Sequence, residues 1–300
     1  MGILMKLACA GVAWRQFKAE ESVVFAEIAE AGFKAVPWKS TDGREGSAKV
    51  LADEIVEKHA AYGLTSAPGY LWANFWERDY SADVAWRAAV SKELGLDVLF
   101  VSAGGFERTM KSGRRRDQIA GRVETADELS TAEFQQFATN LNRAGKVASD
   151  AGVRLAYHPH AGTVIESAAE VQWLLENSDP DVVFLGPDTG HLKWGGTNVE
   201  EFFAAQAERI VAVHAKDVDA KVVEAAAKNE WEYDKCESSG VFTEIGSGCI
   251  NFRSLVASLE TASFDGWIIN ETDYTQLPTA LESATECYNQ LTALGIGIGQ

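Results

Sequence analysis

The chain has 300 residues, of which 46% are hydrophobic and 24% are charged. That balance is typical of a globular protein with a large core, and it excludes a chain that is disordered throughout. The formal net charge of −17 makes the averaged surface repel nucleic acids and anionic membranes, so we expect neither as a partner. One basic run, residues 111–116, is too short and too poor in aromatic residues to change that expectation.

The cysteines and the apolar segments indicate a soluble protein of a reducing compartment. The cysteines lack the spacing of a thiolate metal site or a disulfide framework; they are Cys9, Cys236, Cys249 and Cys287. Residues 1–6 lack the apolar core of a signal peptide. No segment reaches the roughly 18 consecutive apolar residues of a membrane span. We therefore expect a cytoplasmic protein.

Short apolar runs, typical of buried strands, alternate along the chain with stretches of helical spacing. The eight predicted strands are Lys6–Ala10, Phe33–Pro37, Leu64–Ala67, Leu96–Ser102, Val153–Tyr157, Val182–Leu185, Ile210–Val213 and Trp267–Asn270. The eight predicted helices are Val23–Ala31, Ala48–Tyr62, Ala82–Leu94, Thr131–Ala151, Ala168–Glu176, Val199–Ala207, Phe252–Leu259 and Thr279–Leu291. Strict alternation indicates parallel strands joined by crossover helices. Eight such units favour a closed α/β barrel, the (β/α)8 TIM barrel, over an open doubly wound sheet of about five to seven strands.

We expect one barrel domain over residues 1–300, because no linker rich in proline or serine divides the chain. Two stretches interrupt the alternation, residues 104–130 and 218–250. In a barrel both follow strands on the face where catalytic residues gather, and long loops there commonly form lids or substrate walls. The second stretch contains a charged, alanine-rich piece, residues 219–229, that is predicted to form a short helix.

Histidine is scarce in this chain, yet four of its five histidines fall between positions 158 and 214. His158 and His160 follow the fifth predicted strand, His191 follows the sixth, and His214 follows the seventh. The other histidine, His59, falls in a predicted outer helix. Since a barrel places its catalytic groups at the carboxyl ends of its strands, the clustered histidines predict a functional site there.

Predicted strands five to eight each end in a potential metal ligand. Asp188 follows the sixth strand and Glu271 the eighth, so they join His158 and His214 at one end of the barrel. Imidazole and carboxylate ligands together suit Mn²⁺, Fe²⁺, Co²⁺ or Zn²⁺ better than Ca²⁺, and two imidazoles make Mg²⁺ less suitable. We expect one divalent ion, with Mn²⁺ as the first choice. The alternative is that each polar group only caps its own strand.

The motifs at these strand ends resemble those of the xylose-isomerase-like barrel superfamily of sugar isomerases, epimerases and dehydratases. The resemblance lies in residues 188–191 (Asp-Thr-Gly-His), in residues 214–217 (His-Ala-Lys-Asp) and in the apolar strand before Glu271. With residues 157–163 (Tyr-His-Pro-His-Ala-Gly-Thr) included, the pattern is most similar to the inosose dehydratase family. The resemblance extends over essentially the whole chain.

The resemblance implies a metal ion bound by a residue of the fifth strand, by Asp188, by His214 and by Glu271. Epimerases and isomerases of this superfamily usually carry a glutamate on the fifth strand, where this chain has His158. Either His158 takes the ligand position, which its place at the strand end favours, or Glu166 reaches back to it. The implied substrate is a small polyhydroxylated keto compound.

Nine tryptophans are many for a chain of this length, and most of them must fill the core. Five differ because they fall just after predicted strands, on the expected active face: Trp14, Trp38, Trp72, Trp76 and Trp194. The flat indole ring can stack on the C–H face of a carbohydrate. We expect two or three of these side chains to contact the substrate, with Trp14, Trp38, Trp72 and Trp194 as the candidates.

A metal ion beside a ketone lowers the pKa of the neighbouring C–H group and stabilises the enediolate that forms. Two histidines and a lysine beside the metal suit one base and one acid that protonates a departing hydroxyl. Glu166 or His160 is the predicted base, and His191 or Lys216 is the predicted acid. We therefore expect a metal-dependent hydro-lyase acting on a keto-cyclitol, or on a 3-keto-sugar by elimination or hydration.

Three other functions stay open on the sequence. A ketose epimerase or an aldose-ketose isomerase would use the same metal centre, and product analysis separates it from a dehydratase. A sugar-binding barrel or subunit without catalysis is an alternative of another class. Barrels of this superfamily also include endonucleases with three zinc ions, but five histidines and a net charge of −17 disfavour that function. Assembly into a homo-oligomer is compatible with all of these.

Overall fold

The computed structural model describes residues 5–39 and 47–297 of the protein. Residues 1–4, which belong to the segment that lacks the apolar core of a signal peptide, lie outside the described part. In the described ranges, every helix is too short or too polar to cross a lipid bilayer.

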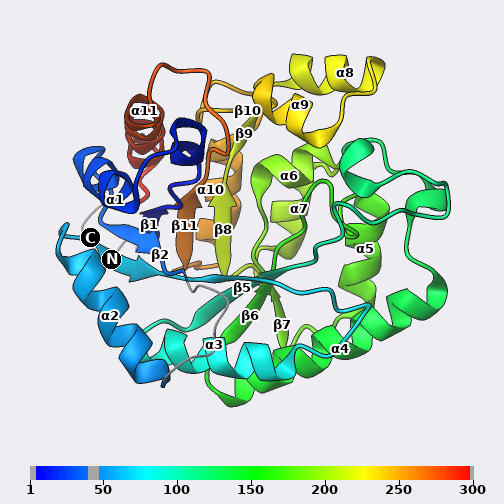
Figure 1. The fold of residues 1–300 in the computed structure, drawn as a ribbon, viewed down its shortest axis with the longest axis horizontal. Coiled ribbons are helices and arrows are strands. Elements are labelled where there is room, and N and C mark those ends of the chain that lie inside the picture. Colours follow the sequence, from blue (N-terminus) through cyan, green and yellow to red (C-terminus); the bar gives the residue numbers. More distant parts are fainter. Residues whose placement is uncertain (1–4, 40–46, 298–300) are drawn as a thin grey trace.

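Parallel strands form a closed barrel in the described part of the chain (Figure 1). They are β1 (Lys6–Cys9), β2 (Ala35–Pro37), β3 (Thr65–Ala67), β4 (Tyr70–Trp72), β5 (Val98–Ser102), β6 (Arg154–Tyr157), β7 (Val183–Leu185), β8 (Ala212–Ala215) and β11 (Trp267–Asn270). Strands β4 to β7 pair in sequence order, β2 pairs with β3, and β11 lies between β8 and β1. Parallel bridges from Leu185 to Ile210 and from Asp188 to His214 join β7 to β8, and β1 lies beside β2. The predicted (β/α)8 barrel is confirmed.

The third strand position is divided into β3 and β4, which the sequence did not predict. β3 pairs with β2, whereas β4 pairs with β5. Between them, Pro68 has no N–H to donate, and Gly69 makes room for the indole of Trp38. A Cβ atom at Gly69 would lie 2.4 Å from the Cε2 atom of Trp38. The division extends the strand as far as Trp72.

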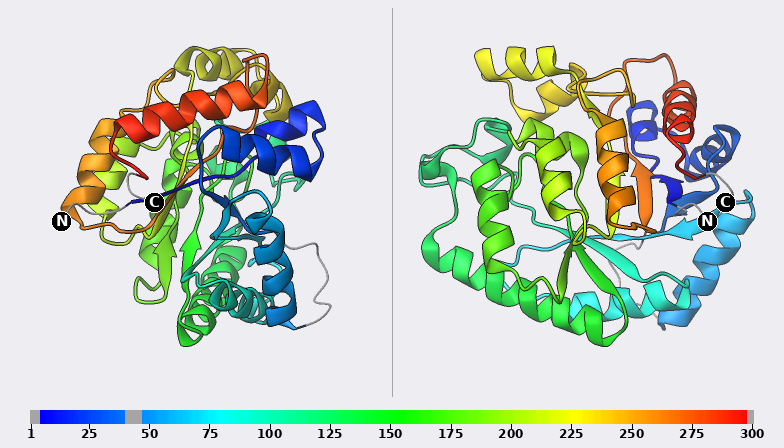
Figure 2. Two further views of the ribbon diagram at one scale, coloured as in Figure 1. Left: turned by 90° about the vertical axis from the view of Figure 1, so that its left-hand side faces the viewer. Right: turned by 180° about the vertical axis from the view of Figure 1, so that it is seen from behind.

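The eight predicted outer helices are all present and surround the strands (Figure 2). They are α1 (Glu21–Glu30), α2 (Ala48–Ala60), α3 (Ser81–Glu93), α4 (Thr131–Asp150), α5 (Ala168–Asn177), α7 (Val199–Gln206), α10 (Phe252–Thr261) and α11 (Ala280–Ala293). Capping boxes begin α4 and α5, with Ser130 and Ser167 as the N-cap residues. The two ends of the described chain meet, because the N–H of Gly297 donates to the carbonyl of Met5 at 2.9 Å.

The two predicted insertions lie together on one side of the barrel. The second contains an antiparallel pair, β9 (Asp217–Val218) with β10 (Phe242–Thr243), and the helices α8 (Ala220–Lys228) and α9 (Tyr233–Ser238). Helix α8 confirms the short helix predicted at residues 219–229, and it lies at the edge of the molecule in Figure 1. Arg122 of the first insertion donates to the carbonyl of Trp231 at 2.9 Å. The insertions therefore form one continuous rim.

The interior of the barrel is filled by side chains. All five residues of β5 are buried. The ring of Phe100, on this strand, stacks against Tyr70 with centroids 6.4 Å apart and lies 4.4 Å from the imidazole of His214. An apolar floor thus lies beneath the histidines at the carboxyl ends of the strands.

Candidate metal centre

Side chains from the ends of four neighbouring strands converge at the mouth of the barrel. One ligand atom each of His158, Asp188 and His214 lies within 4.8 Å of the others. His158 follows β6, Asp188 follows β7, and His214 belongs to β8. Glu271 directly follows β11, and its Oε2 atom lies 2.5 Å from Nδ1 of His214. The structure thus brings together the four side chains predicted as metal ligands.

Several buried atoms of this group are left without hydrogen bonds. Among the described residues, no hydrogen bond with acceptable geometry is present at Nδ1 of His158, Oδ2 of Asp188 or Nδ1 of His214, although Oδ2 of Asp188 lies in an ion pair with Lys216. The short contact between His214 and Glu271 therefore lacks hydrogen-bond geometry. Leaving a buried polar atom unsatisfied costs about 1–3 kcal/mol, so a convergent set of such atoms indicates a ligand that satisfies them. Imidazole nitrogens with carboxylate oxygens fit a divalent transition metal or zinc.

The charges around this group also favour a divalent cation. Asp188, Glu271 and Asp273 contribute three carboxylates, whereas Lys216 contributes one ammonium. Nζ of Lys216 lies 2.7 Å from Oδ2 of Asp273, 3.2 Å from Oδ2 of Asp188 and 3.5 Å from Oε1 of Glu271. With all four groups ionised, two negative charges remain uncompensated in a buried site. Binding a divalent cation neutralises them.

The pKa values of these groups follow from burial and from their neighbours. Burial alone would lower the pKa of Lys216, but the three carboxylates outweigh it and raise that pKa above its ordinary value. Burial raises the pKa of Asp188 to about 6, although nearby Lys216 acts in the opposite direction. Burial opposes ionisation of Glu271 as well, but Lys216 and His214 hold its pKa well below the ordinary value. Lys216 is therefore a permanent cation here and cannot act as a base.

His160 and His191 lie beside the four predicted metal ligands, which we call the metal group. Their ring centroids are 3.5 Å apart and their ring planes are tilted by 31°. Nδ1 of His160 lies 2.7 Å from the carbonyl oxygen of Ala161, which only accepts, so Nδ1 carries the proton and Nε2 keeps a lone pair. Nε2 of His191 lies 3.0 Å from the ammonium of Lys216, which only donates, so the proton of His191 is on Nδ1. That Nδ1 atom has no hydrogen-bond partner in the described part of the chain.

Both of these imidazoles are held neutral. Burial lowers the pKa of His160 to about 3, and burial also lowers the pKa of His191 well below the ordinary value. His160 therefore offers an acceptor nitrogen and His191 offers a donor N–H. A second group of three, His158, His160 and His191, also has ligand atoms within 4.8 Å of one another. The ammonium of Lys216 beside His191 opposes a cation at that position.

The structure does not bring Glu166 to the metal group. Its carboxylate accepts hydrogen bonds from the backbone N–H groups of Gly121 and Gly162, and Nη2 of Arg116 lies 3.7 Å from it. Burial raises the pKa of Glu166 to about 7. Because both carboxylate oxygens are bound by loops, Glu166 does not reach back to the fifth strand, and His158 takes that place in the cluster.

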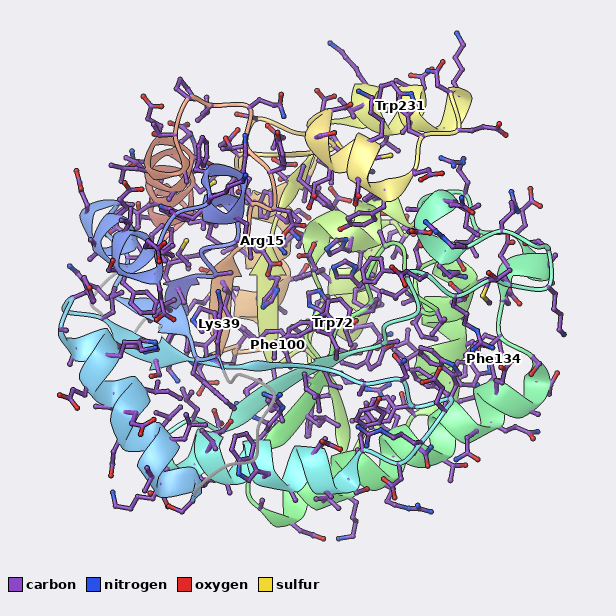
Figure 3. The ribbon with its side chains drawn as sticks, in the orientation of Figure 1. Arg15, Lys39, Trp72, Phe100, Phe134 and Trp231 are labelled. Carbon is purple, nitrogen blue, oxygen red and sulfur yellow. The ribbon has the colours of Figure 1, made fainter. Side chains whose placement is uncertain are left out.

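Aromatic side chains surround His160. The indole of Trp72, predicted to contact the substrate, is 45% exposed and lies edge-on to the imidazole, with centroids 5.2 Å apart. Phe106 and Tyr233, from the two insertions, lie 5.4 Å and 6.1 Å from the same ring. Trp194 is buried behind Tyr233, 5.1 Å away. Figure 3 shows Trp72 near the centre of the view. The structure thus places Trp72 in this rim and Trp194 behind it.

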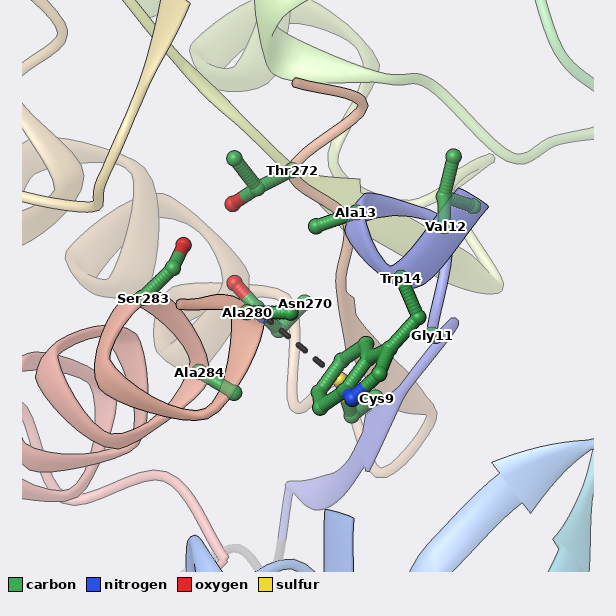
Figure 4. A pocket seen from close by; sticks show the side chains of 10 residues that line it. All are labelled: Cys9, Gly11, Val12, Ala13, Trp14, Asn270, Thr272, Ala280, Ser283 and Ala284. Atoms are coloured by element: carbon green, nitrogen blue, oxygen red, sulfur yellow. Dashed lines mark hydrogen bonds between the residues drawn. The ribbon is translucent and has the colours of Figure 1, made fainter. Parts of the chain in front are cut away.

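The other two predicted tryptophans turn toward the outer helices. Nε1 of Trp14 donates to Glu27 of α1 at 2.6 Å. Trp14 lines a cavity of about 10 Å³ with Cys9 and Asn270, shown in Figure 4, which has room for about one water molecule. Trp38 is buried, with the guanidinium of Arg87 from α3 6.0 Å from its ring. Both indoles pack the barrel against its helices, so the expected contact with substrate is not supported by their position.

Sequence reasoning missed several residues of this site. Asp273 comes two residues after Glu271, and a second carboxylate beyond the same strand end was a signal that could have identified it. Tyr70 lies on the unpredicted β4, with its ring 5.3 Å from that of His158. Phe106 and Tyr233 come from the insertions, whose irregular paths no periodicity predicts.

Fold and site together define a (β/α)8 barrel protein with a candidate divalent-metal centre at the carboxyl ends of its strands. A family model described as xylose isomerase-like TIM barrel matches residues 25–291. The chain belongs to this family, as the motifs at its strand ends indicated.

Several relatives of this chain are named inosose dehydratase, and two of them show the extent of the similarity. The protein of Geobacillus kaustophilus (strain HTA426) is 38% identical over 149 residues, which are 50% of this chain and 48% of the relative. The chain therefore aligns with about half the length of that relative. The protein of Clostridium botulinum (strain Alaska E43 / Type E3) is 27% identical over 252 residues, covering 82% of this chain and 80% of the relative.

Solved structures share the fold at low sequence identity. The probable 3-DHS dehydratase AsbF from Bacillus anthracis has a TM-score of 0.67 and 14% identity, covering 96% of this chain and 99% of that one. The IOLI protein with a bound zinc atom has a TM-score of 0.65 and 14% identity, covering 97% of this chain and 98% of that one. These similarities extend over the whole barrel.

Proposed function

We propose that the chain is a metal-dependent hydro-lyase that removes water from a keto-cyclitol, such as an inosose, or from a related keto-sugar. The observation that carries the proposal is the position of His160 and His191 beside the metal group, one with a free acceptor nitrogen and the other with a free donor N–H. Elimination of water needs one group of each kind. The relatives named inosose dehydratase support this assignment.

His158, Asp188, His214 and Glu271 would hold one divalent ion, with Mn²⁺ as the first choice and Zn²⁺, Co²⁺, Fe²⁺ or Mg²⁺ as alternatives. When bound, the ion supplies polarisation of the substrate ketone, which lowers the pKa of the neighbouring C–H group. The IOLI structure, which shares this fold, has a bound zinc atom, and this supports metal binding by the chain.

His160 and His191 divide the proton transfers of the proposed reaction. Nε2 of His160 takes the proton from the carbon beside the ketone, and the electron pair of that C–H bond forms the enediolate. Nδ1 of His191 then donates its proton to the hydroxyl on the next carbon as the C–O bond breaks, so the hydroxyl leaves as water. Loss of that proton leaves His191 as an imidazolate, and the ammonium of Lys216, 3.0 Å from Nε2, stabilises its negative charge without giving up a proton of its own. His191 regains a proton, and His160 releases the one it took, through solvent once the product has left.

The rim of the site suits a ring-shaped, uncharged substrate. Trp72, Phe106 and Tyr233 present aromatic rings around His160. Such rings contact the C–H faces of a cyclitol or pyranose. We infer that the partner of this site is a small polyhydroxylated keto compound.

The test is product analysis with the metal-loaded protein. Keto-inositols and 3-keto-glycosides are incubated with protein carrying Mn²⁺, and ultraviolet absorbance and NMR follow the products. We expect a dehydrated enone or dione to accumulate in proportion to enzyme concentration. If the only product is a stereoisomer or an aldose-ketose isomer of the substrate, the epimerase or isomerase function replaces the lyase.

A further inference from the structure

A cluster of buried charges beside this site has no part in the proton transfers above. It consists of Arg116, Glu166 and Glu170, whose side chains are all 0% exposed. Arg116 forms two parallel hydrogen bonds of 2.9 Å to the two oxygens of Glu170, and its Nη2 atom lies 3.7 Å from Oε2 of Glu166. Burying three charged groups is unfavourable unless each is paired and hydrogen-bonded. Because burying these charges is costly, we expect the cluster to hold neighbouring parts of the chain in fixed positions.

Glu166 connects two loops that are far apart in the sequence. One oxygen accepts from the N–H of Gly121, in the insertion of residues 104–130. The other accepts from the N–H of Gly162 at 2.6 Å, two residues after His160. Glu166 therefore fastens the segment that carries His160 to the neighbouring rim.

The segment from His160 to Glu166 is a tight turn. The N–H of His160 donates to the carbonyl of Ile165 at 3.2 Å, and the hydroxyl of Thr163 donates to the carbonyl of His160 at 2.7 Å. Gly162 has φ of +78°, and a Cβ there would come within 3.0 Å of Phe106 and Tyr233. A shift of this turn would therefore move the imidazole of His160 relative to that of His191.

We propose that Glu166 is a positioning residue: with Arg116 and Glu170 behind it, it fixes the turn that orients His160 against His191. This inference rests on the proposed function for its catalytic consequence, but the orientation of His160 can be measured without substrate. Glu166 then acts through His160 and touches neither metal nor substrate.

The test compares Glu166→Gln with a matched control, Asp127→Asn. Gln keeps the size of Glu but turns an N–H₂ group toward one of the two backbone N–H donors, so one hydrogen bond is lost. Asp127 is a buried carboxylate of the same insertion, and its side chain contacts Ser112, Arg114 and the backbone N–H of Glu124. Only its backbone carbonyl meets the cluster, accepting from Nη1 of Arg116 at 2.9 Å, and Asn keeps that carbonyl. It does not connect the insertion to the His160 turn.

The first readout is histidine NMR of the zinc-loaded protein, which needs no turnover. We expect Glu166→Gln to shift the signals of His160 and His191, to leave that of His59 unchanged, and to retain one equivalent of zinc. Asp127→Asn should leave all of these signals in place. If the signals of His160 in Glu166→Gln coincide with those of wild type, or if Asp127→Asn shifts them equally, the positioning role is wrong.

The second readout is turnover of the substrate identified for the wild type. We expect Glu166→Gln to lower kcat by about 10- to 100-fold, the range typical of residues that orient a catalytic side chain, with KM nearly unchanged. Should Glu166→Gln fail to fold, Glu166→Asp keeps the charge beside Arg116 but shortens the reach, and the same NMR shift is expected. A wild type without lyase activity contradicts the proposed function alone, since the NMR comparison still decides the positioning role.

Discussion

His160 and His191 are neutral imidazoles with opposite hydrogen-bonding capacities, and each capacity is set by a neighbour. A carbonyl oxygen fixes the proton of His160 on Nδ1, and an ammonium fixes the proton of His191 on the same atom of its own ring. The difference is that Nδ1 of His160 is occupied whereas Nδ1 of His191 is free. Two identical side chains thus become a proton acceptor and a proton donor.

This division predicts different effects of two substitutions. Replacing His160 with Asn should suppress both product formation and exchange of the substrate's α hydrogen with deuterated water, because no enediolate forms without the base. Replacing His191 with Asn should suppress product formation by about 10²- to 10⁴-fold while exchange is much less affected. NMR of the substrate in deuterated water measures both rates. Equal losses of exchange and product in His191→Asn would contradict the assignment.

The sequence predicted which side chains converge at the mouth of the barrel better than it predicted the positions of the residues around them. His158, Asp188, His214 and Glu271 each lie at or just beyond the end of a strand, where the barrel itself determines where a side chain lies. Glu166 comes eight residues after His158, beyond a tight turn, and its direction depends on Gly121 of a distant insertion. Such a contact leaves no periodic signal. The same limit applies to the tryptophans, because position after a strand does not decide which way an indole turns.

At the scale of elements, hydrophobic periodicity predicted the long and regular helices. All eight outer helices occur, with ends within about two residues of those expected. The short strand β4 was not predicted because Pro68 and Gly69, just before it, are residues typical of loops. The six-residue helix α6 (Thr189–Trp194) was not predicted because it begins inside the strand-end motif of residues 188–191. Asp188 is its N-cap and accepts a hydrogen bond from the N–H of His191. The acidic residue therefore serves as cap and candidate ligand at once.

His59 gives α2 a dependence on pH that is separate from the metal centre. It is buried, its Nδ1 lies 2.9 Å from the hydroxyl of Ser66, and burial lowers its pKa from 6.5 to about 4. The folded state thus holds His59 neutral, so the stabilisation is fully present above pH 6.5 and is lost as the pH falls from 6.5 toward 4. The shift corresponds to at most about 3 kcal/mol.

We expect His59→Gln to reduce the sensitivity of folding to acid. Between pH 7 and pH 4.5, the free energy of unfolding of the wild type should fall by about 1 to 3 kcal/mol more than that of the variant. Urea unfolding at several pH values, with chelator present throughout, measures the difference. Parallel pH profiles for the two proteins would show that another group is responsible.

At the scale of the whole molecule, the candidate metal site joins elements that are distant in the sequence. Its four candidate ligands follow or belong to β6, β7, β8 and β11, and β11 also pairs with β1, the first strand of the barrel. The site holds three carboxylates against one ammonium within a chain that already carries a net charge of −17. Repulsion among these carboxylates works against the closed barrel until a cation balances it.

Metal removal should therefore lower the thermal stability of the entire barrel. An ion present at about 100 times its dissociation constant stabilises the folded state by about 2.7 kcal/mol, which corresponds to about 4 to 8 °C in Tm for a chain of this size. Differential scanning calorimetry with and without chelator, followed by return of Mn²⁺ or Zn²⁺, measures the shift.

Variants separate this effect from binding of the ion elsewhere on an acidic surface. Asp188→Asn and His214→Ala should lose both the bound equivalent of metal and the shift in Tm, because each removes a ligand from the cluster. His160→Asn should keep both, since the imidazole of His160 lies beside the cluster, next to His191, and donates to the carbonyl of Ala161. If Asp188→Asn and His214→Ala retain the metal and its full stabilising effect, the ion is bound elsewhere and the convergence of these four strand ends has another cause.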